Sequence, residues 1–334
     1  MLRLLIFWLA LSASLPVAAD ACQWNIEDPL ARPGADQGAT VVTAKLYVND
    51  ITAINDVEQS FEADVMFRAD WQDPRLAHNN PTPCVLDPES AWTPVLQPLN
   101  RRKIERIRPP QLSVARDGTV TFMLRTFGEF SFRADLSDFP FDTQKLGFYL
   151  VSRFGPEQVE FQTAPELIGM AQELSVANWR VQLNGFEIGT EYIPPVDQHL
   201  ARLDLLLQAE RRSSYYTWQQ ITPLLLVVMM TWVVFWIPFE FVPARVALAA
   251  TSMLTLIAYR FAIASALPPI AYLTRLDRFL IGSSVLVFLA LAGAVAVSYI
   301  AEKHGEDHAH GLNRTARWMS PALLIAVLWA SFAA

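Results

Sequence analysis

The sequence predicts an all-β, immunoglobulin-like sandwich followed by an α-helical bundle that spans a membrane four times. Two observations support this fold class. Most charged residues and prolines lie in residues 22–215, whereas most long apolar runs lie in residues 216–334. Hydrophobic residues make up 52% of the chain and charged residues 18%. This composition is too apolar for a purely soluble protein and too charged for one that lies wholly within a membrane.

Residues 1–21 have the pattern of a secretory signal peptide. Arg3 provides the positive start, an apolar core follows, and small residues surround a cleavage point after Ala19 or Ala21. The segment is short for a membrane-spanning helix. We therefore expect residues 22–215 to be exported as an extracellular or periplasmic domain, with lipidation of Cys22 as the alternative processing.

The chain contains two cysteines, Cys22 and Cys84. An even number of cysteines in an oxidising compartment permits a disulfide. Two free thiols are the other possibility, and the sequence leaves the choice open. Two isolated cysteines are not expected to bind a metal, and no cofactor is expected.

The exported part reads as a series of β-strands. Residues 60–71, SFEADVMFRADW, alternate between apolar and polar side chains, which indicates a half-buried strand. The apolar face consists of Phe61, Ala63, Val65, Phe67, Ala69 and Trp71. Further strands are expected within residues 117–127, 144–152 and 201–210, and proline-rich turns separate them. Many short strands with such turns are typical of an antiparallel sandwich.

The second part, residues 216–334, contains four apolar segments of about the 20 residues that a bilayer requires. They are residues 216–237, 243–267, 279–300 and 317–334. If the first part is exported, the linkers 238–242 and 301–317 lie on the inner side. The second linker contains Lys303, Arg314 and Arg317, which agrees weakly with the positive-inside rule.

The second apolar segment has an unusual composition for a lipid-facing helix. On a helix starting at Pro243, small, hydroxylic and a few bulky side chains recur every three or four residues on one stripe. The stripe consists of Ala247, Thr251, Leu254, Ala258, Phe261 and Ser265. The pattern fits either close helix packing or the lining of a water-filled pore.

Several motifs, in order along the chain, resemble the pentameric ligand-gated ion channels, the Cys-loop receptor superfamily. The motifs are WQDPRL (71–76), WTPVLQPLN (92–100), FPFD (139–142), RRSSYYTWQQITP (211–223), PARV (243–246) and LPP (267–269). The resemblance covers nearly the whole mature chain. It implies a homopentamer in lipid, with the second span of each subunit around a central pore for inorganic ions.

Two departures from the animal receptors resemble the bacterial branch of this superfamily. The cysteines that flank the signature loop are replaced by Phe132 and Leu146. The long insert between the third and fourth spans is missing. The resemblance therefore implies a multi-pass protein of a bacterial inner membrane, with its first domain in the periplasm, and it excludes Cys22 and Cys84 as the family's loop disulfide.

In this family the inner end of the pore helix sets ion selectivity. Pro243, Ala244 and Arg245 match the anion-selective pattern, and Ala244 removes the ring of carboxylates that would attract cations. Helix N-termini and Arg245 would favour anions at this mouth, which Ala244 would line. Glu240 precedes the motif and could favour cations instead, so a cation-selective or weakly selective pore is the alternative.

The resemblance also implies a gating interface between the two parts of the chain. Asp56 and Asp142 are expected to meet Arg211, and Tyr272 belongs to the linker that receives the movement. The expected set is Asp56, Val57, Phe139, Pro140, Asp142, Arg211, Pro268, Pro269 and Tyr272. Ordinary surface turns are the alternative reading for the two aspartates.

A small agonist is expected to bind between subunits. By the resemblance, its site would consist of Met66, Arg68, Asn100, Arg101, Arg153, Phe154 and Tyr192. Aromatic residues are few and arginines stand close by, so an acidic ligand or the proton itself fits as well as an amine. Solvated strand-face charges are the alternative for each arginine.

Other classes of function find less support in the sequence. The net charge of −7 and the absence of a basic run argue against nucleic acid as a partner. An enzyme is not expected, because the only histidines in residues 22–215 are His78 and His199, and the segment has no catalytic or phosphate-binding motif. A ligand sensor that conducts nothing is the remaining alternative. His304 and His308 have metal-ligand spacing, but a solvated loop on the inner side is the preferred interpretation.

Overall fold

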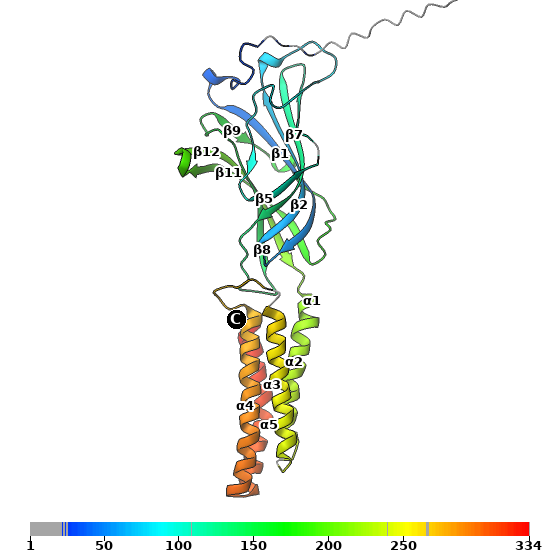
Figure 1. Ribbon diagram of the computed structural model, residues 1–334, viewed down its shortest axis with the longest axis vertical. Coiled ribbons are helices and arrows are strands. Elements are labelled where there is room, and N and C mark those ends of the chain that lie inside the picture. Colours follow the sequence, from blue (N-terminus) through cyan, green and yellow to red (C-terminus); the bar gives the residue numbers. More distant parts are fainter. Residues whose placement is uncertain are drawn as a thin grey trace, which may run out of the picture.

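The computed structural model describes residues 22, 24, 26–107, 109–238, 240–264 and 267–333. The predicted signal peptide lies outside this part of the chain. A β-domain occupies one end of an elongated molecule and a helical bundle the other (Figure 1). The chain passes from the first to the second directly after Arg211, the last residue of the last strand.

The larger sheet has the strand order β10-β1-β2-β7-β6-β3, with β9 also paired to β1 and β5 to β7. Its strands are β1 (Thr40–Asn55), β2 (Ser60–Gln72), β3 (Cys84–Leu86), β5 (Arg101–Arg106), β6 (Gln111–Val114), β7 (Thr119–Ser131), β9 (Val159–Gln162) and β10 (Ile168–Met170). The pairs β1–β2 and β2–β7 are antiparallel, whereas β9 and β10 run parallel to β1.

The smaller sheet has the order β11-β12-β8-β4. Its strands are β4 (Gln97–Pro98), β8 (Thr143–Val151), β11 (Trp179–Ile193) and β12 (Gln198–Arg211). The register places Trp179 opposite Arg211 at the end of the sheet nearest the helices. This pairing becomes important at the junction between the two domains.

The two sheets pack face to face around one apolar core, as the alternation predicts. The predicted apolar face of β2, from Phe61 to Trp71, is buried throughout. Phe132 and Leu146, which stand at the positions of the family's loop cysteines by the resemblance, are also buried in this core. Phe132 lies edge-on to Phe61, at 6.3 Å between ring centroids. Apolar packing therefore occupies the two positions that the resemblance assigned to the family's loop cysteines.

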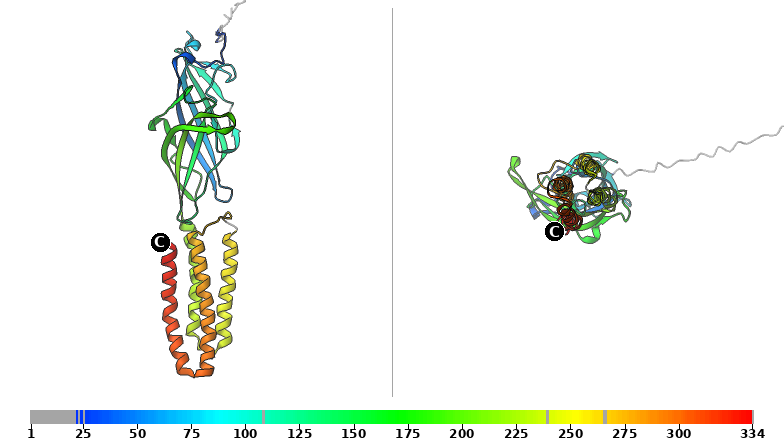
Figure 2. Two further views of the ribbon diagram at one scale, coloured as in Figure 1. Left: turned by 90° about the vertical axis from the view of Figure 1, so that its left-hand side faces the viewer. Right: turned by 90° about the horizontal axis from the view of Figure 1, so that it is seen from below.

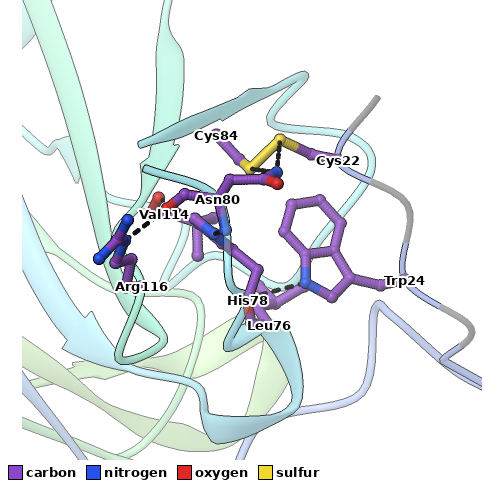
Figure 3. Close-up of a disulfide and its surroundings, with 8 residues drawn as sticks. All are labelled: Cys22, Trp24, Leu76, His78, Asn80, Cys84, Val114 and Arg116. Atoms are coloured by element: carbon purple, nitrogen blue, oxygen red, sulfur yellow. Dashed lines mark hydrogen bonds between the residues drawn. A yellow bond between two sulfur atoms is a disulfide. The ribbon is translucent and has the colours of Figure 1, made fainter. Parts of the chain in front are cut away.

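The cysteine pairing that the sequence left open is a disulfide between Cys22 and Cys84. Figure 3 shows it beside Trp24, whose Nε1 donates a hydrogen bond to the Leu76 carbonyl at 2.8 Å. The Asn80 side-chain amide lies 3.2 and 3.3 Å from the two sulfur atoms. The disulfide and the Trp24 bond together attach the start of the described chain to the far end of the sandwich.

The bundle consists of four helical segments that are long and apolar enough to cross a membrane: Ser214–Trp236, Val242–Ile263, Arg275–His304 and Glu306–Phe332. The first combines α1 (Ser214–Tyr216), a π-helical turn (Thr217–Ile221), α2 (Thr222–Val233) and a 3₁₀ turn (Val234–Trp236). The others are α3 (Val242–Ala264), α4 (Arg275–His304) and α5 (Glu306–Phe332). Figure 2 shows the four segments side by side.

The third and fourth helices are longer than the sequence predicted. The third was expected at 279–300, but α4 begins at Arg275, because Thr274 and Asp277 form a reciprocal capping box. The fourth was expected at 317–334, but α5 begins at Glu306. The predicted loop around His304 and His308 is therefore wrong. His304 is the last residue of α4, His308 lies in α5, and only Gly305, at φ 91°, separates the two helices.

We expect loss of the disulfide to destabilise the β-domain. Reducing it frees a chain segment that it holds across 62 residues of sequence, and removal of such a bond costs about 2–5 kcal/mol. Cys22→Ser should therefore lower the thermal unfolding midpoint of the purified full-length protein. Dithiothreitol should lower the wild-type midpoint by a similar amount and leave that of Cys22→Ser unchanged. Equal midpoints for all four samples would contradict this role.

Candidate functional site

Helix α3 has one buried face and one exposed face within the subunit. Ala249, Ser252, Leu256 and Ile263 are buried against the other helices. The predicted stripe lies on the opposite side: Ala247, Thr251, Leu254, Ala258 and Phe261 are all exposed, as is Ala244 at the predicted mouth. Leu254 is 68% exposed and Phe261 73%. Ser265, the last predicted member, lies outside the described residues. The stripe therefore does not pack within its own subunit, which removes intrasubunit packing as its explanation.

Two hydroxyls of this face are bonded to the helix itself. The Thr251 hydroxyl donates to the Ala247 carbonyl at 2.8 Å, and the Thr255 hydroxyl donates to the Thr251 carbonyl at 2.9 Å. Each hydroxyl can still accept hydrogen bonds from outside the helix. Such a surface is suited to water or ions and poorly suited to lipid.

The inner end of α3 differs from the prediction in one respect. Pro243, Ala244 and Glu240 are exposed, but Arg245 is completely buried inside the subunit. Its Nε donates to the Val234 carbonyl at 3.0 Å and its Nη2 to Asn313 Oδ1 at 2.7 Å. Arg245, which was expected to favour anions near the mouth, therefore points into its own subunit and away from the exposed face of α3. The helical period explains the difference, because Arg245 shares the buried row of Ala249, Ser252 and Leu256.

The junction between the two domains is organised around Arg211. Its guanidinium binds Asp142 through Nε and Nη2, at 2.7 and 3.0 Å, and Asp56 through Nη1 and Nη2, both at 2.8 Å. Asp56 lies in the turn between β1 and β2, and Asp142 lies directly before β8. One buried side chain thus joins three segments that are far apart in sequence, as the resemblance implied.

Three aromatic rings enclose the same guanidinium. Its central carbon lies 4.0 Å from the Trp179 ring centroid, 5.0 Å from Phe139 and 5.6 Å from Tyr216. Burial alone would lower the pKa of Arg211, but the bonds to Asp56 and Asp142 outweigh it and raise the pKa above its usual value. The sequence did not identify Trp179 or Tyr216. Only the strand register, which places Trp179 opposite Arg211, shows that Trp179 belongs to this site.

The loop of residues 136–142, here called the FPFD loop, rests on the start of α4. The Arg275 backbone N–H donates to the Ser137 carbonyl at 3.1 Å, and the Arg275 side chain pairs with Asp138 at 2.7 Å. The Tyr272 hydroxyl accepts a hydrogen bond from the Leu136 N–H at 2.9 Å. The linker between α3 and α4 is therefore bonded directly to the β-domain.

The remaining predicted junction residues surround these contacts. Pro140 is buried, Val57 is 47% exposed in the β1–β2 turn, and Pro269 is exposed. Pro268 and Pro269 line a cavity of about 410 Å³ together with Tyr272 and Arg260. Empty space thus lies beside the linker that the FPFD loop contacts.

The predicted ligand residues do not converge within one subunit. Met66 and Arg68 lie on β2 of the larger sheet, whereas Tyr192 lies on β11 of the smaller sheet. The Asn100 side chain has a structural role, because its amide donates to the carbonyls of Ser131 and Gly147 at 2.9 and 2.8 Å.

The other members of this predicted set are either paired or exposed. Arg68 is paired with Asp70 at 2.8 Å. Phe154 packs against Trp92 at 5.5 Å, and the Tyr192 hydroxyl donates to Asp197 at 2.9 Å. Arg101 and Arg153 are exposed. The structure of one subunit therefore does not bring the predicted set together.

A charged cluster near Tyr192 was not predicted. Arg202 binds Asp204 through two bonds of 2.7 Å, pairs with Glu191, and lies over the Tyr149 ring at 5.1 Å. The bonds to Asp204 and Glu191 raise the pKa of Arg202, and burial raises that of Tyr149. Arg202 and Asp204 line a hollow of about 300 Å³ on the smaller sheet. The alternation of β12 does not indicate this cluster, because the side chains that contact Arg202 come from three strands, β8, β11 and β12.

Comparisons with known proteins agree with this architecture. The neurotransmitter-gated ion-channel ligand-binding domain matches residues 26–162, and the transmembrane region of the same channels matches residues 220–326. Similar curated proteins include gamma-aminobutyric acid receptor subunit alpha-2 from Bos taurus and Homo sapiens, each 27% identical over 83% of this chain. Subunit gamma-3 from Homo sapiens is 26% identical over 81% of it.

The chain spans 64% of the length of the alpha-2 subunits and 60% of the gamma-3 subunit. The relatives are animal proteins, so they do not support the bacterial placement that the missing cysteines and the short linker suggested. The two family models nevertheless cover the β-domain and the bundle in the order that the structure shows. The chain belongs to the neurotransmitter-gated ion-channel family, the pentameric ligand-gated or Cys-loop channels, whose members are channels and not enzymes.

Proposed function

We propose that five copies of this chain form a ligand- or proton-gated channel whose pore is lined by the exposed face of α3. The observation that carries the proposal is the set of unpacked residues from Ala244 to Phe261 on a helix whose other face is buried. One such helix cannot enclose a path for ions. Five around an axis place each residue in a ring, so that Thr251 forms a hydroxylic ring, Leu254 an apolar gate and Phe261 an outer constriction.

We propose anion preference for this pore. Because Arg245 is buried, the preference rests on the absence of a carboxylate at Ala244 and on the α3 N-termini around the inner mouth. Glu240 is exposed just before the helix and opposes it. Pro243, Ala244 and Arg245 therefore act through the shape of the mouth. Ala244 is exposed toward the proposed pore, whereas the Arg245 side chain is buried within the subunit.

The agonist is proposed to bind between the larger sheet of one subunit and the smaller sheet of the next. The relatives are named for gamma-aminobutyric acid, a small molecule with one ammonium and one carboxylate group. The exposed Arg101 and Arg153 provide positive charge for a carboxylate. Tyr192 and the Asp204–Arg202–Glu191 cluster lie on the strand pair that would cover the ligand.

Gating is proposed to pass through Arg211 and the FPFD loop to the linker between α3 and α4. The ion pair between Asp138 and Arg275 and the hydrogen bond from the Leu136 N–H to the Tyr272 hydroxyl connect the β-domain directly to this linker. The cavity beside Pro268 and Pro269 offers room for the linker to move.

We further propose a homopentamer in a bacterial inner membrane, with the β-domain in the periplasm. This placement rests on the predicted signal peptide, on the absence of the loop cysteines at Phe132 and Leu146, and on the direct junction of α4 and α5 at Gly305. The oxidised Cys22–Cys84 pair fits an exported domain.

Recordings from purified protein in planar bilayers test the proposal. Under a salt gradient, screened over pH and over small amines and acids, the reversal potential should lie on the anion side. Ala244→Glu should move it toward the cation value, because five carboxylates would surround the mouth. The neutral, equally large Ala244→Gln should leave its sign unchanged. A wild-type reversal at the cation value would refute the selectivity, and a protein that binds ligand without ever conducting would be a sensor.

Arg211→Ala should abolish agonist- or acid-evoked currents while the protein still reaches the membrane. The substitution leaves Asp56 and Asp142 without their shared partner, and breaking a buried pair costs about 3–5 kcal/mol. Arg180→Ala is the matched control, because Arg180 lies on the same strand pair but is exposed and paired with Glu210 only at 3.4 Å. Normal currents in Arg211→Ala, with surface expression measured in parallel, would remove Arg211 from the gating path.

A further inference from the structure

Pro223 and Pro321 lie inside membrane helices, the first in the segment Ser214–Trp236 and the second in α5. A proline has no backbone N–H, so the carbonyl four residues earlier loses the hydrogen bond that an α-helix would give it. The carbonyls affected are those of Gln219 and Arg317. In the apolar part of a membrane, such a carbonyl needs a donor from a neighbouring helix.

Both carbonyls accept a hydrogen bond from an aromatic side chain of another helix. Trp232 Nε1, on α2, donates to the Arg317 carbonyl at 2.7 Å. The Tyr259 hydroxyl, on α3, donates to the Gln219 carbonyl at 2.8 Å. The two bonds are alike in chemistry but join different helices. The first connects α2 to α5, whereas the second connects the first membrane segment to α3, the helix that carries the exposed stripe.

Gln219 also lies in the π-helical turn Thr217–Ile221, directly before α2. Here the Thr222 N–H bonds to the Thr217 carbonyl, one residue further back than in an α-helix, and the Thr222 hydroxyl donates to the same carbonyl at 2.8 Å. Turns of this kind occur frequently at functional sites. The Tyr259 bond therefore attaches α3 to the part of the first segment whose own backbone bonding is irregular.

The same turn begins beside the charged junction of the two domains. Tyr216, the residue before it, accepts a hydrogen bond from Arg211 Nη1 at 3.4 Å and lies edge-on to Phe139, at 4.9 Å between ring centroids. A continuous row of contacts thus leads from Arg211 through Tyr216 and the π-helical turn to Tyr259 on α3. This row does not pass through the linker between α3 and α4.

Tyr259 lies next to the exposed face of α3 without belonging to it. Ala258 and Phe261, on the same turn, are exposed, whereas Tyr259 is half-buried and packs against the apolar cluster that includes Phe279. Because its hydroxyl is bonded to the first segment, a tilt of that segment would displace this turn of α3 or break the bond.

We propose that Tyr259 is a positioning residue for the pore helix. Its hydrogen bond to the carbonyl that Pro223 leaves free couples the first membrane segment to the turn of α3 that carries Phe261. The inference rests on the proposed channel function and adds a second connection from Arg211 to the pore, separate from the FPFD loop. The similar bond of Trp232 joins two helices that do not line the proposed pore, so it stabilises the bundle without this role.

Currents evoked by a rapid step from neutral to acidic pH, in purified full-length protein in bilayers, test the coupling. Tyr259→Phe removes only the hydroxyl. It should raise the proton concentration for half-maximal current about threefold, the factor that corresponds to one interhelical hydrogen bond in a membrane. Tyr299→Phe is the matched control, because its hydroxyl is bonded to Lys303 of the same helix, at 3.1 Å. It should leave the half-maximal concentration unchanged.

Trp232→Phe separates positioning from simple stabilisation. Like Tyr259→Phe, it loses a bond to a carbonyl that a proline leaves free, so both variants should lower the thermal unfolding midpoint. Only Tyr259→Phe should shift the half-maximal proton concentration. Equal shifts in the two variants would overturn the proposal, as would an unchanged or lowered half-maximal concentration in Tyr259→Phe.

Hydrogen–deuterium exchange tests the coupling without any current. Tyr259→Phe should speed backbone exchange in the outer half of α3, and Tyr299→Phe should not. Pro223→Ala gives the Gln219 carbonyl a donor within its own helix, so Tyr259→Phe should have a smaller effect in that background, which is the non-additivity expected of directly coupled residues.

Additive effects on exchange would overturn the coupling. If Pro223→Ala does not assemble, equal exchange in Tyr259→Phe and Tyr299→Phe would overturn it instead. A wild type that never conducts would refute the channel function, whereas the exchange results would still decide whether Tyr259 couples the two helices.

Discussion

The structure depends on one buried charge, the Arg211 guanidinium held between Asp56 and Asp142. Each carboxylate belongs to a different loop of the β-domain, and the arginine ends the strand that continues into the first membrane helix. Trp179, Phe139 and Tyr216 exclude water around the group, so each ionic bond acts in a medium of low polarity. All three charged groups belong to the β-domain, but Tyr216 comes from the first membrane helix, so separating the two domains would uncover one side of the guanidinium. The contact ties the geometry of the sandwich to that of the bundle.

Helix α3 shows how one segment meets two different demands. Its buried row carries Arg245 and Ser252 into the subunit, where carbonyl and amide groups receive them. Its exposed row carries small and hydroxylic residues with two bulky apolar positions. Their separation leaves a surface that no other helix of the subunit covers within the described residues. The family assignment provides the fivefold arrangement that the single chain lacks.

Much of this architecture could be predicted from the sequence because it is carried by local patterns. The alternation of β2 fixed its buried face, and the FPFD motif located Asp142 beside Arg211. Prediction failed for two reasons. The start of α4 is set by a local capping box between Thr274 and Asp277, which the search for apolar runs did not detect. The direction of Arg245 depends on a distant contact with Asn313, which lies 68 residues later. The Arg202 cluster draws on three strands, whose register the sequence does not specify.

The path of α5 sets the position of the last described residues of the chain. Because only Gly305 separates it from α4, the helix returns along the bundle, and its end lies next to the β-domain (Figure 1). There Phe332 packs against Phe141 at 5.8 Å between ring centroids, and its carbonyl accepts a bond from Arg275 at 3.0 Å. The last turn of α5 thus contacts both the FPFD loop and the start of α4. In the gating path proposed above, bilayer thickness and helix tilt would therefore act on the same contacts as the agonist, and a sequence fused beyond Phe332 would emerge beside the FPFD loop.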